Sequence, residues 1–263
     1  MQIGAQLYSA HKRLKTLEDL DAGLNKVADI GYRSVQVSGV CAYEPEWMRD
    51  ELQKYGLTCA ITHIALDRIV NEPEKVIAEH AIFGCKNIGI GMMPKDLRGS
   101  LEGYYAFRDM LLPVAKKFKD LGATLHYHNH QFEFDPLYGL NMMERMNEDF
   151  PEGTLELTLD LGWADAAGMD VVKLIDTLKG RISRVHLKDY LPLPTDRELE
   201  PKTAVYLRPI YEGQVDYDPI IKALEVAGTE YALVEQDHCY GEDEFDCLKR
   251  SYENVVSRFP NMK

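Results

Sequence analysis

The chain has 263 residues, of which 45% are hydrophobic and 28% are charged, and its formal net charge is −13 at pH 7. This composition is typical of a soluble globular protein with a sizeable core and excludes extensive disorder. The negative charge disfavours nucleic acid and anionic membranes as partners, because both would be repelled. The length fits a single domain over residues 1–263, since α/β barrels run to about 250 residues as one unit.

The N-terminus lacks a basic segment followed by an apolar run, and the sequence holds no stretch of about 18 apolar residues. We therefore expect a cytoplasmic protein without a membrane span. Five cysteines are scattered without CxxC spacing, so we expect reduced thiols that are mostly buried. The sequence leaves open whether the chain forms a homo-oligomer or pairs with a different subunit.

Short β-rich segments alternate with longer helical patterns along the whole chain, which favours parallel βαβ units. The pattern predicts eight strands, near Ile3–Ser9, Ser34–Gly39, Thr58–Ile64, Asn87–Met92, Thr124–His130, Leu155–Leu161, Ile182–Lys188 and Tyr231–Gln236. Between them it predicts helices such as Leu17–Ile30, Pro73–Phe83, Leu101–Leu121, Val171–Leu178 and Tyr217–Ala227. Strands and helices in this alternation predict a closed (β/α)8 TIM barrel.

One long irregular stretch, Tyr190–Asp216, follows the seventh predicted strand and is rich in Pro, Glu and Tyr. We expect it to cover the substrate. In such a barrel the loops at the C-terminal ends of the strands build the active site, whereas the opposite face serves stability. The polar residues that end each strand are therefore the candidates for function.

The fifth predicted strand carries three histidines at alternating positions, His126, His128 and His130, and Glu133 follows them. Alternation places the three imidazoles on one face, and an apolar outer face under helices would not accept them. We therefore expect them to point into the barrel. A single strand histidine is more often a core residue with a satisfied hydrogen bond, but three in register indicate a functional site.

The next three strands also end in groups that can bind a metal ion. Strand six runs through apolar residues into Asp160, which either joins the site or caps the following helix. Strand seven carries His186 and Lys188, and strand eight ends in Glu235, whose charge needs a cation at the edge of the core. Lys188 could supply that cation in place of a metal. The mixed oxygen and nitrogen ligands predict a divalent ion, Mn²⁺ in preference to Mg²⁺, Co²⁺, Fe²⁺ or Zn²⁺, since carboxylates dominate the set.

At these residues the chain resembles the xylose isomerase-like TIM barrel superfamily, which includes sugar phosphate isomerases and epimerases, inosose dehydratases and apurinic endonucleases. The resemblance runs nearly end to end. It is carried by His128-Asn129-His130 with Glu133-Phe134, Leu159-Asp160, His186-Leu187-Lys188-Asp189, Glu212-Gly213 with Asp216, and Glu235.

The resemblance implies a metal held by a Glu, an Asp, a His and a Glu on strands five to eight. Asp160, His186 and Glu235 match this set directly. His128 stands at the usual Glu position of strand five, with Glu133 beyond it. We expect Glu133 to be the fourth ligand because it restores three carboxylates, and His128 is the alternative.

The resemblance also implies a sugar isomerase or epimerase that acts on a keto-sugar or related polyol through an enediolate stabilised by the metal. Candidate bases are the carboxylates of Glu133 and Glu235, and His128 or His130 could instead move the proton. Loss of a β-substituent from the same intermediate would make the chain a lyase of keto-inositols or 3-keto-glycosides, including C-glycosides. A non-catalytic binding subunit is a further alternative, which the retained metal ligands oppose.

Three residues are candidates for binding the carbohydrate. His63, at the end of strand three, and Lys188 could bind hydroxyl groups, and Trp163 could pack against the apolar face of a sugar. Trp163 also stands where the apurinic endonucleases carry a further metal-binding histidine. The resemblance therefore implies one metal ion and no cleavage of abasic DNA. The sequence shows no Gly-rich cradle, so a phosphorylated substrate is not predicted.

Overall fold

A computed structural model of the chain describes residues 1–136, 139–195, 198–199 and 203–263. Eight parallel strands close into a barrel in the order β1-β10-β7-β6-β5-β4-β3-β2. They are β1 (Gln2–Gln6), β2 (Ser34–Val37), β3 (Thr58–His63), β4 (Asn87–Ile90), β5 (Thr124–His128), β6 (Leu155–Asp160), β7 (Arg184–Leu187) and β10 (Tyr231–Val234). Each overlaps a predicted strand, so the predicted TIM barrel is confirmed.

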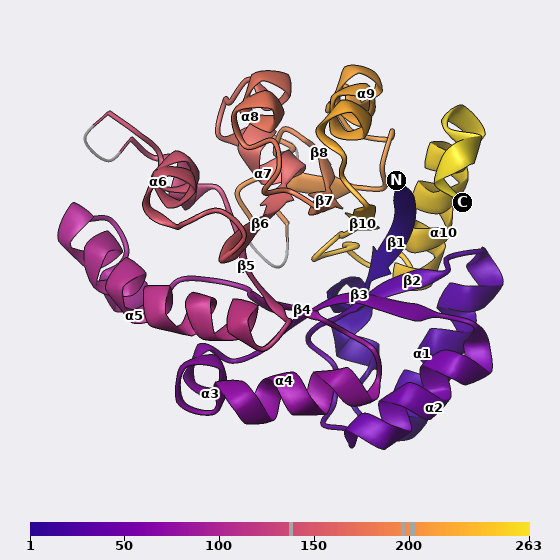
Figure 1. Ribbon diagram of the computed structural model, residues 1–263. Coiled ribbons are helices and arrows are strands. Elements are labelled where there is room, and N and C mark those ends of the chain that lie inside the picture. The colour runs from indigo at the N-terminus through magenta and orange to yellow at the C-terminus, as the bar shows by residue number, and fades with distance from the viewer. Residues whose placement is uncertain (137–138, 196–197, 200–202) are drawn as a thin grey trace.

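Helices surround the strands on the outside of the barrel, and the two chain ends lie side by side (Figure 1). The α-helices are α1 (Leu17–Ile30), α2 (Pro45–Tyr55), α3 (Leu66–Asn71), α4 (Pro73–Ile82), α5 (Leu101–Asp120), α6 (Met142–Asp149), α7 (Leu161–Ala166), α8 (Val171–Thr177), α9 (Tyr217–Ala227) and α10 (Glu244–Arg258). Short 3₁₀ helices are η1 (Leu7–Arg13), η2 (Lys95–Leu97), η3 (Phe132–Phe134) and η4 (Pro260–Met262). The named helix predictions match α1, α4, α5, α8 and α9. Among the helices of the described residues, none is long and apolar enough to cross a membrane.

Local sequence signals explain where these helices begin and what they bury. α1 starts at a capping box, in which the Thr16 and Asp19 side chains each accept a hydrogen bond from the other's backbone N–H. One face of α1 then packs Leu20, Leu24 and Val27 into the core. The barrel strands are buried on both sides, as expected for a parallel sheet covered by helices. All five cysteines are free, and three of them are buried, as predicted.

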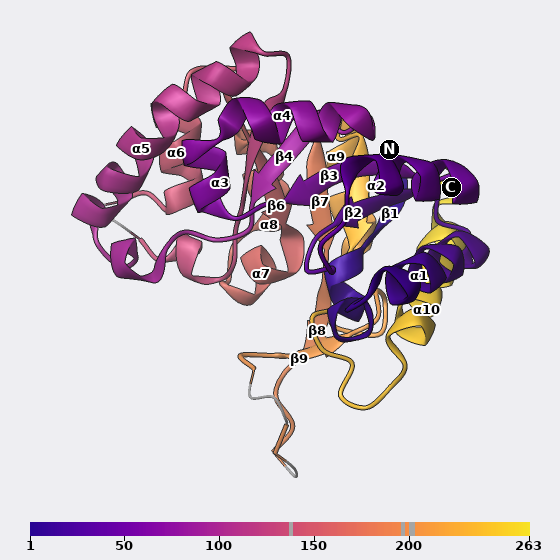
Figure 2. The same cartoon turned by 90° about the horizontal axis from the view of Figure 1, so that it is seen from below.

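The stretch predicted to be irregular instead contains an antiparallel strand pair, β8 (Asp189–Leu191) and β9 (Tyr206–Arg208). The pair projects beyond the end of β7 (Figure 2). The buried carboxylate of Asp189 holds the base of this segment. It accepts hydrogen bonds from the backbone N–H groups of Tyr190, Tyr211, Gly213 and Val215. Residues 196–197 and 200–202 of this stretch lie outside the described residues.

Candidate functional site

Four buried side chains meet inside the barrel, at the ends of β5, β6, β7 and β10. His128 ends β5, Asp160 ends β6, His186 lies on β7, and Glu235 directly follows β10. Each offers one nitrogen or oxygen atom, and these atoms lie within 4.8 Å of one another. None of the four residues is more than 5% exposed. Two carboxylates and two imidazoles that are buried and lie this close together form a set that suits a divalent cation. We call these four residues the metal group.

Three atoms of the metal group lack the hydrogen bonds that buried polar atoms normally make. They are Asp160 Oδ2, His186 Nδ1 and Glu235 Oε2, which have no hydrogen-bond partner among the described residues. His186 Nδ1 lies 2.9 Å from Glu235 Oε2 and 3.7 Å from Asp160 Oδ2. The three atoms therefore face a common point, and the Lys188 ammonium lies beside it, 3.1 Å from both Asp160 Oδ2 and Glu235 Oε2.

Neighbouring strands hold the outer nitrogen of each imidazole. His186 Nε2 lies 2.7 Å from the side-chain oxygen of Gln36 on β2. His128 Nδ1 lies 3.3 Å from the backbone carbonyl oxygen of Thr158 on β6. With the proton on each of these nitrogens, the other ring nitrogen keeps its lone pair toward the metal group. The contact of His128 thus favours the tautomer that metal binding requires. Burial opposes a charge on His186, but Glu235 and Asp160 raise its pKa to about 9, so a metal ion would have to displace a proton from this ring.

Glu133 lies outside the metal group, which corrects the expectation that it, rather than His128, completes the set. β5 ends at His128, so residue 133 lies beyond the strand, where alternation no longer applies. The Glu133 carboxylate accepts hydrogen bonds from the Tyr127 hydroxyl at 2.7 Å and the His130 backbone N–H at 2.8 Å. Tyr127 points out of the barrel and packs against Phe107 of α5. Glu133 therefore fastens the turn after β5 and is not placed to act as a base at the metal group.

Asp160 has two separate contacts through its two oxygens. Oδ1 accepts a hydrogen bond from the Trp163 backbone N–H at 2.8 Å and so caps α7. Oδ2 faces the metal group. Asp160 therefore caps α7, which is one of the two interpretations that the sequence left open, and its second oxygen faces His186, as the other interpretation expects.

All three histidines of β5 and its end face the barrel interior, as predicted, but they have different surroundings. His126 is fully buried, with Nε2 3.1 Å from Asn87 Oδ1 and Nδ1 3.4 Å from Thr158 Oγ1. Both of its nitrogens are thus engaged below the metal group. His130 instead lines the cavity described next.

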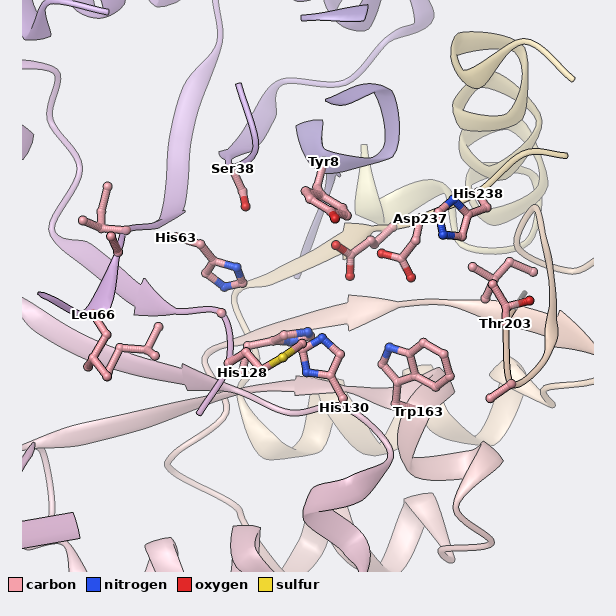
Figure 3. Close-up of a pocket in the computed structure, with 18 residues that line it drawn as sticks. Tyr8, Ser38, His63, Leu66, His128, His130, Trp163, Thr203, Asp237 and His238 are labelled. Atoms are coloured by element: carbon pink, nitrogen blue, oxygen red, sulfur yellow. The ribbon is translucent and has the colours of Figure 1, made fainter. Parts of the chain in front are cut away.

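A cavity of about 530 Å³ adjoins the metal group, and His128 and Glu235 form part of its lining. Of the residues predicted to bind substrate, His63 and Trp163 line this cavity with His130 (Figure 3). Part of the segment predicted to cover the substrate also lines it. These residues are Thr203, Ala204 and Leu207.

Lys188, the third residue predicted to bind substrate, faces the carboxylates of the site. Its Nζ lies 3.1 Å from Asp160 Oδ2, 3.1 Å from Glu235 Oε2 and 2.9 Å from Asp237 Oδ2. Burial opposes the charge on this lysine, but the three carboxylates hold its pKa well above the usual value. Lys188 therefore supplies a positive charge beside Glu235 and Asp160. A substrate hydroxyl would have to displace one of these carboxylates to reach it.

His63 and His130 are neutral imidazoles in the cavity. Burial, together with the nearby His186, lowers the pKa of His63 to about 3. Burial and the charge of Lys188 lower the pKa of His130 to about 4. His63 Nε2 and His130 Nδ1 are buried and have no hydrogen-bond partner in the parts of the chain that the structure describes. Both rings can therefore form hydrogen bonds with a ligand.

Several residues of the site were not predicted. Asp237 and His238 follow β10, Tyr8 lies on η1, and all three line the cavity. Asp237 could have been found from the sequence, because it is a second carboxylate that closely follows the predicted eighth strand, at the end of the barrel where active sites lie. Tyr8 and Gln36 carried no such signal, since neither is charged nor close in sequence to another site residue.

Comparisons with known proteins agree with this fold. The family model described as xylose isomerase-like TIM barrel matches residues 24–250. The chain belongs to this family. A curated relative, inosose dehydratase from Geobacillus kaustophilus (strain HTA426), is 27% identical over 248 residues, which cover 82% of this chain and 80% of that protein.

Solved structures of the same fold extend over nearly the whole chain. A sugar phosphate isomerase/epimerase from Parabacteroides distasonis ATCC 8503 matches with a TM-score of 0.78 at 19% identity, over 97% of each chain. The IolI protein, solved with a bound zinc atom, matches with a TM-score of 0.73 at 14% identity, over 100% of this chain and 99% of that chain. At these identities the likeness shows the shared fold alone.

Proposed function

We propose that this chain is a divalent-metal-dependent sugar isomerase or epimerase that acts on a keto-sugar or related polyol through an enediolate. The observation that carries the proposal is the convergence of His128, Asp160, His186 and Glu235 at the wall of a cavity. Membership of the xylose isomerase-like TIM barrel family supports it. The complete metal group also favours an enzyme over a non-catalytic binding subunit.

The donor set supports a transition-metal ion. It combines two imidazole nitrogens with two carboxylate oxygens. Imidazole suits Fe²⁺, Co²⁺ and Zn²⁺, whereas Mg²⁺ prefers oxygen ligands alone. The sequence-based preference for Mn²⁺ depended on Glu133 as a third carboxylate, so His128 weakens it. We therefore propose Fe²⁺, Co²⁺, Zn²⁺ or Mn²⁺ rather than Mg²⁺.

We propose a separate role in the reaction for the metal group, for Glu235 and for the histidines of the cavity. A divalent ion at the metal group supplies polarisation of a substrate carbonyl and stabilisation of the charge that develops on its oxygen. Glu235 is the base that we propose for the proton beside that carbonyl. Burial opposes its ionisation, but Lys188 holds its pKa well below the usual value, so the carboxylate is ionised. The neutral rings of His63 and His130 bind hydroxyl groups, and His130 can exchange a proton with substrate.

Lyase chemistry is the second candidate, and the replacement of a carboxylate by His128 favours it. Glu235 and Asp160 are the only carboxylates of the metal group, and Oδ1 of Asp160 already caps α7. One carboxylate base is enough for elimination, whereas epimerisation needs a second group to return the proton on the other face. The similarity to an inosose dehydratase points the same way.

Proton exchange in D₂O tests both candidates at once. Metal-loaded protein is incubated with keto-hexoses, keto-inositols and 3-keto-glycosides, and products are analysed for deuterium beside the carbonyl. We expect deuterium in an isomerised or epimerised product, loss of exchange in Glu235→Gln, and a decrease of about 100-fold in His130→Ala if that ring transfers a proton. Glu133→Gln is the matched control and should retain exchange. Conversion to an isomer or epimer without any deuterium, under conditions where the proton escapes to water, would contradict the enediolate. The product, an isomer or an elimination product, decides between the candidates.

We also propose that the chain acts on small carbohydrates in the cytoplasm and not on nucleic acid. The net charge of −13 supports the exclusion of nucleic acid, because proteins bind a duplex by neutralising its phosphates with positive charge.

A further inference from the structure

The cavity beside the metal group has two chemically different walls. The polar wall is formed at the ends of β1, β5 and β10 by Tyr8, His128, His130, Glu235, Asp237 and His238. The apolar wall follows β3 and β4 and consists of Ile64, Ala65, Leu66, Ile90, Gly91 and Met92. The His63 ring, at the end of β3, lies between this wall and the metal group. The six residues of the apolar wall carry no charge and no strong hydrogen-bond donor in their side chains.

The two walls face each other in part. In the closed order of strands, β10 stands opposite β4, whereas β5, which carries His128, adjoins β4. β3 pairs directly with β4, and the Ile64 backbone N–H donates to the Gly89 carbonyl just beyond the strand end, so the apolar wall is continuous. Leu66 lies at one end of the cavity and Asp237 and His238 lie at the other (Figure 3). A ligand that spans the cavity therefore meets charged groups at one end and hydrocarbon at the other.

The cavity leaves part of the apolar wall open to a ligand. Met92 lines the cavity and is 40% exposed. An apolar surface that is left open beside polar binding groups marks the place of the apolar part of a ligand. The cavity volume of about 530 Å³ also falls among pockets that enclose ligands of drug size, roughly 300–1,000 Å³, and exceeds what one sugar ring requires.

We infer that the apolar wall is a subsite for an apolar substituent of aromatic size, so that the substrate is a glycoside or a similarly substituted sugar. The inference rests on the proposed function, because the sugar's oxygens must occupy the metal group and the polar wall. The substituent then lies against Leu66, Ile90 and Met92, where burial alone provides the binding energy. The flexible thioether of Met92 adapts to the shape of a ring and makes favourable contacts with it.

A matched pair of hydroxamates tests this subsite without knowledge of the sugar. The hydroxamate group binds divalent metal ions through two oxygens, so propionohydroxamate and 3-phenylpropionohydroxamate differ only in a phenyl ring. Their affinities for the metal-loaded protein are measured by isothermal titration calorimetry. We expect the phenyl compound to bind about tenfold more tightly or better, because a buried ring of this size contributes at least that much.

Variants of the apolar wall assign the preference to it. Met92→Gln keeps the length of the side chain but not its apolar character, and should reduce the phenyl preference to about threefold or less while propionohydroxamate binds as before. Met92→Leu should retain the preference, and Leu66→Asn should lower it. Val226→Asn is the control, because Val226 is 74% exposed on α9 and lies outside the cavity lining, so both affinities should stay unchanged.

The outcomes separate this inference from the proposed function. A phenyl preference that is lost in Met92→Gln and kept in Met92→Leu supports the subsite. Equal affinities in the unmodified protein, or a preference that survives both Met92→Gln and Leu66→Asn, overturn the subsite and leave the metal group intact. If neither hydroxamate binds, the proposed metal chemistry fails and the subsite inference fails with it.

Discussion

Two fully buried carboxylates near β7, those of Asp160 and Asp189, are treated in opposite ways by the fold. Asp189 accepts four hydrogen bonds from backbone N–H groups, which satisfy both of its oxygens. Asp160 is bonded only through Oδ1, and its Oδ2 has an ion-pair contact with Lys188 but no hydrogen-bond partner within the described ranges. Incomplete hydrogen bonding, rather than burial or residue type, therefore separates a carboxylate available to a ligand from one that holds the structure.

The largest effect on metal binding is expected from removal of Asp160, the carboxylate with an oxygen that has no hydrogen-bond partner among the described residues. Asp160→Ala should abolish metal binding, with an affinity at least 100-fold lower, because a ligand is lost and not only a neighbouring hydrogen bond, whose loss is worth about 10–100-fold. Asp160→Asn keeps an oxygen that can cap α7 but removes the charge, and should bind metal as poorly. Elemental analysis and metal titration measure both. Equal metal content in Asp160→Ala and the unmodified protein would show that the metal group is assigned wrongly.

Removal of Asp189, whose oxygens both accept hydrogen bonds, should instead lower the stability of the fold. Asp189→Ala leaves four backbone N–H groups without their acceptor, so the free energy of unfolding should fall by about 3 kcal/mol or more, as measured with urea. Metal affinity should change by less than about tenfold, well below the loss in Asp160→Ala. If Asp189→Ala loses metal as completely as Asp160→Ala, the contrast between the two carboxylates disappears.

Glu133 is a third buried carboxylate to compare with Asp160 and Asp189. Both of its oxygens accept hydrogen bonds, but burial still shifts its pKa. Burial raises its pKa from the ordinary 4.5 to about 7, although bonds from Tyr127 and the His130 N–H oppose the shift. Because the folded pKa is the higher one, this group stabilises the fold most below about pH 4.5, and the contribution is lost as the pH rises through about 7.

The shift corresponds to about 3 kcal/mol, since one pKa unit is worth about 1.4 kcal/mol. Glu133→Gln removes the titration. The unfolding free energy of the unmodified protein minus that of Glu133→Gln should therefore fall by about this amount between about pH 4 and pH 8. Urea titrations at a series of pH values measure it. A difference that does not vary with pH would mean that Glu133 ionises normally in the fold.

The smallest effect is expected at Gln36, which touches the metal group only through His186. Gln36→Leu removes the oxygen that holds His186 Nε2, so metal affinity should fall by about 10–100-fold. Gln36→Glu restores an acceptor and should recover most of the affinity. Titration with Co²⁺ followed by its visible absorption reports both affinity and ligand geometry. An unchanged spectrum and affinity in Gln36→Leu would show that His186 needs no such support.

The barrel could be predicted from the sequence because its signals are local. Strand and helix periodicities repeat along the chain, and each barrel strand in the structure overlaps a predicted one. The strand pair β8 and β9 could not be predicted in this way. It joins Asp189–Leu191 to Tyr206–Arg208, and its base depends on backbone groups as far along the chain as Val215.

The part of the site that lies on the barrel strands or directly at their ends could be predicted from the alternation of side chains along a strand. Asp160, His186 and Glu235 end predicted strands, and the inward direction of His128 follows from the pleat. The expectation for Glu133 was wrong because β5 ends at His128, and beyond a strand end the spacing no longer fixes the side of the sheet. Gln36 reaches His186 from 150 positions away only because the barrel closes.

Asp160 connects the metal group to a tryptophan, because one of its oxygens faces the metal group and the other accepts a hydrogen bond from the Trp163 backbone N–H. The residue that it caps is Trp163, whose indole ring also lies 4.8 Å from Lys188 Nζ. A cation at the metal group would draw charge from Asp160 and compete with Lys188, so both contacts of Trp163 would change together. The only other tryptophan of the sequence, Trp47, lies on α2 and is not among the residues that line the cavity. We therefore expect metal titration of unlabelled protein to change the emission of Trp163 and to leave that of Trp47 unchanged.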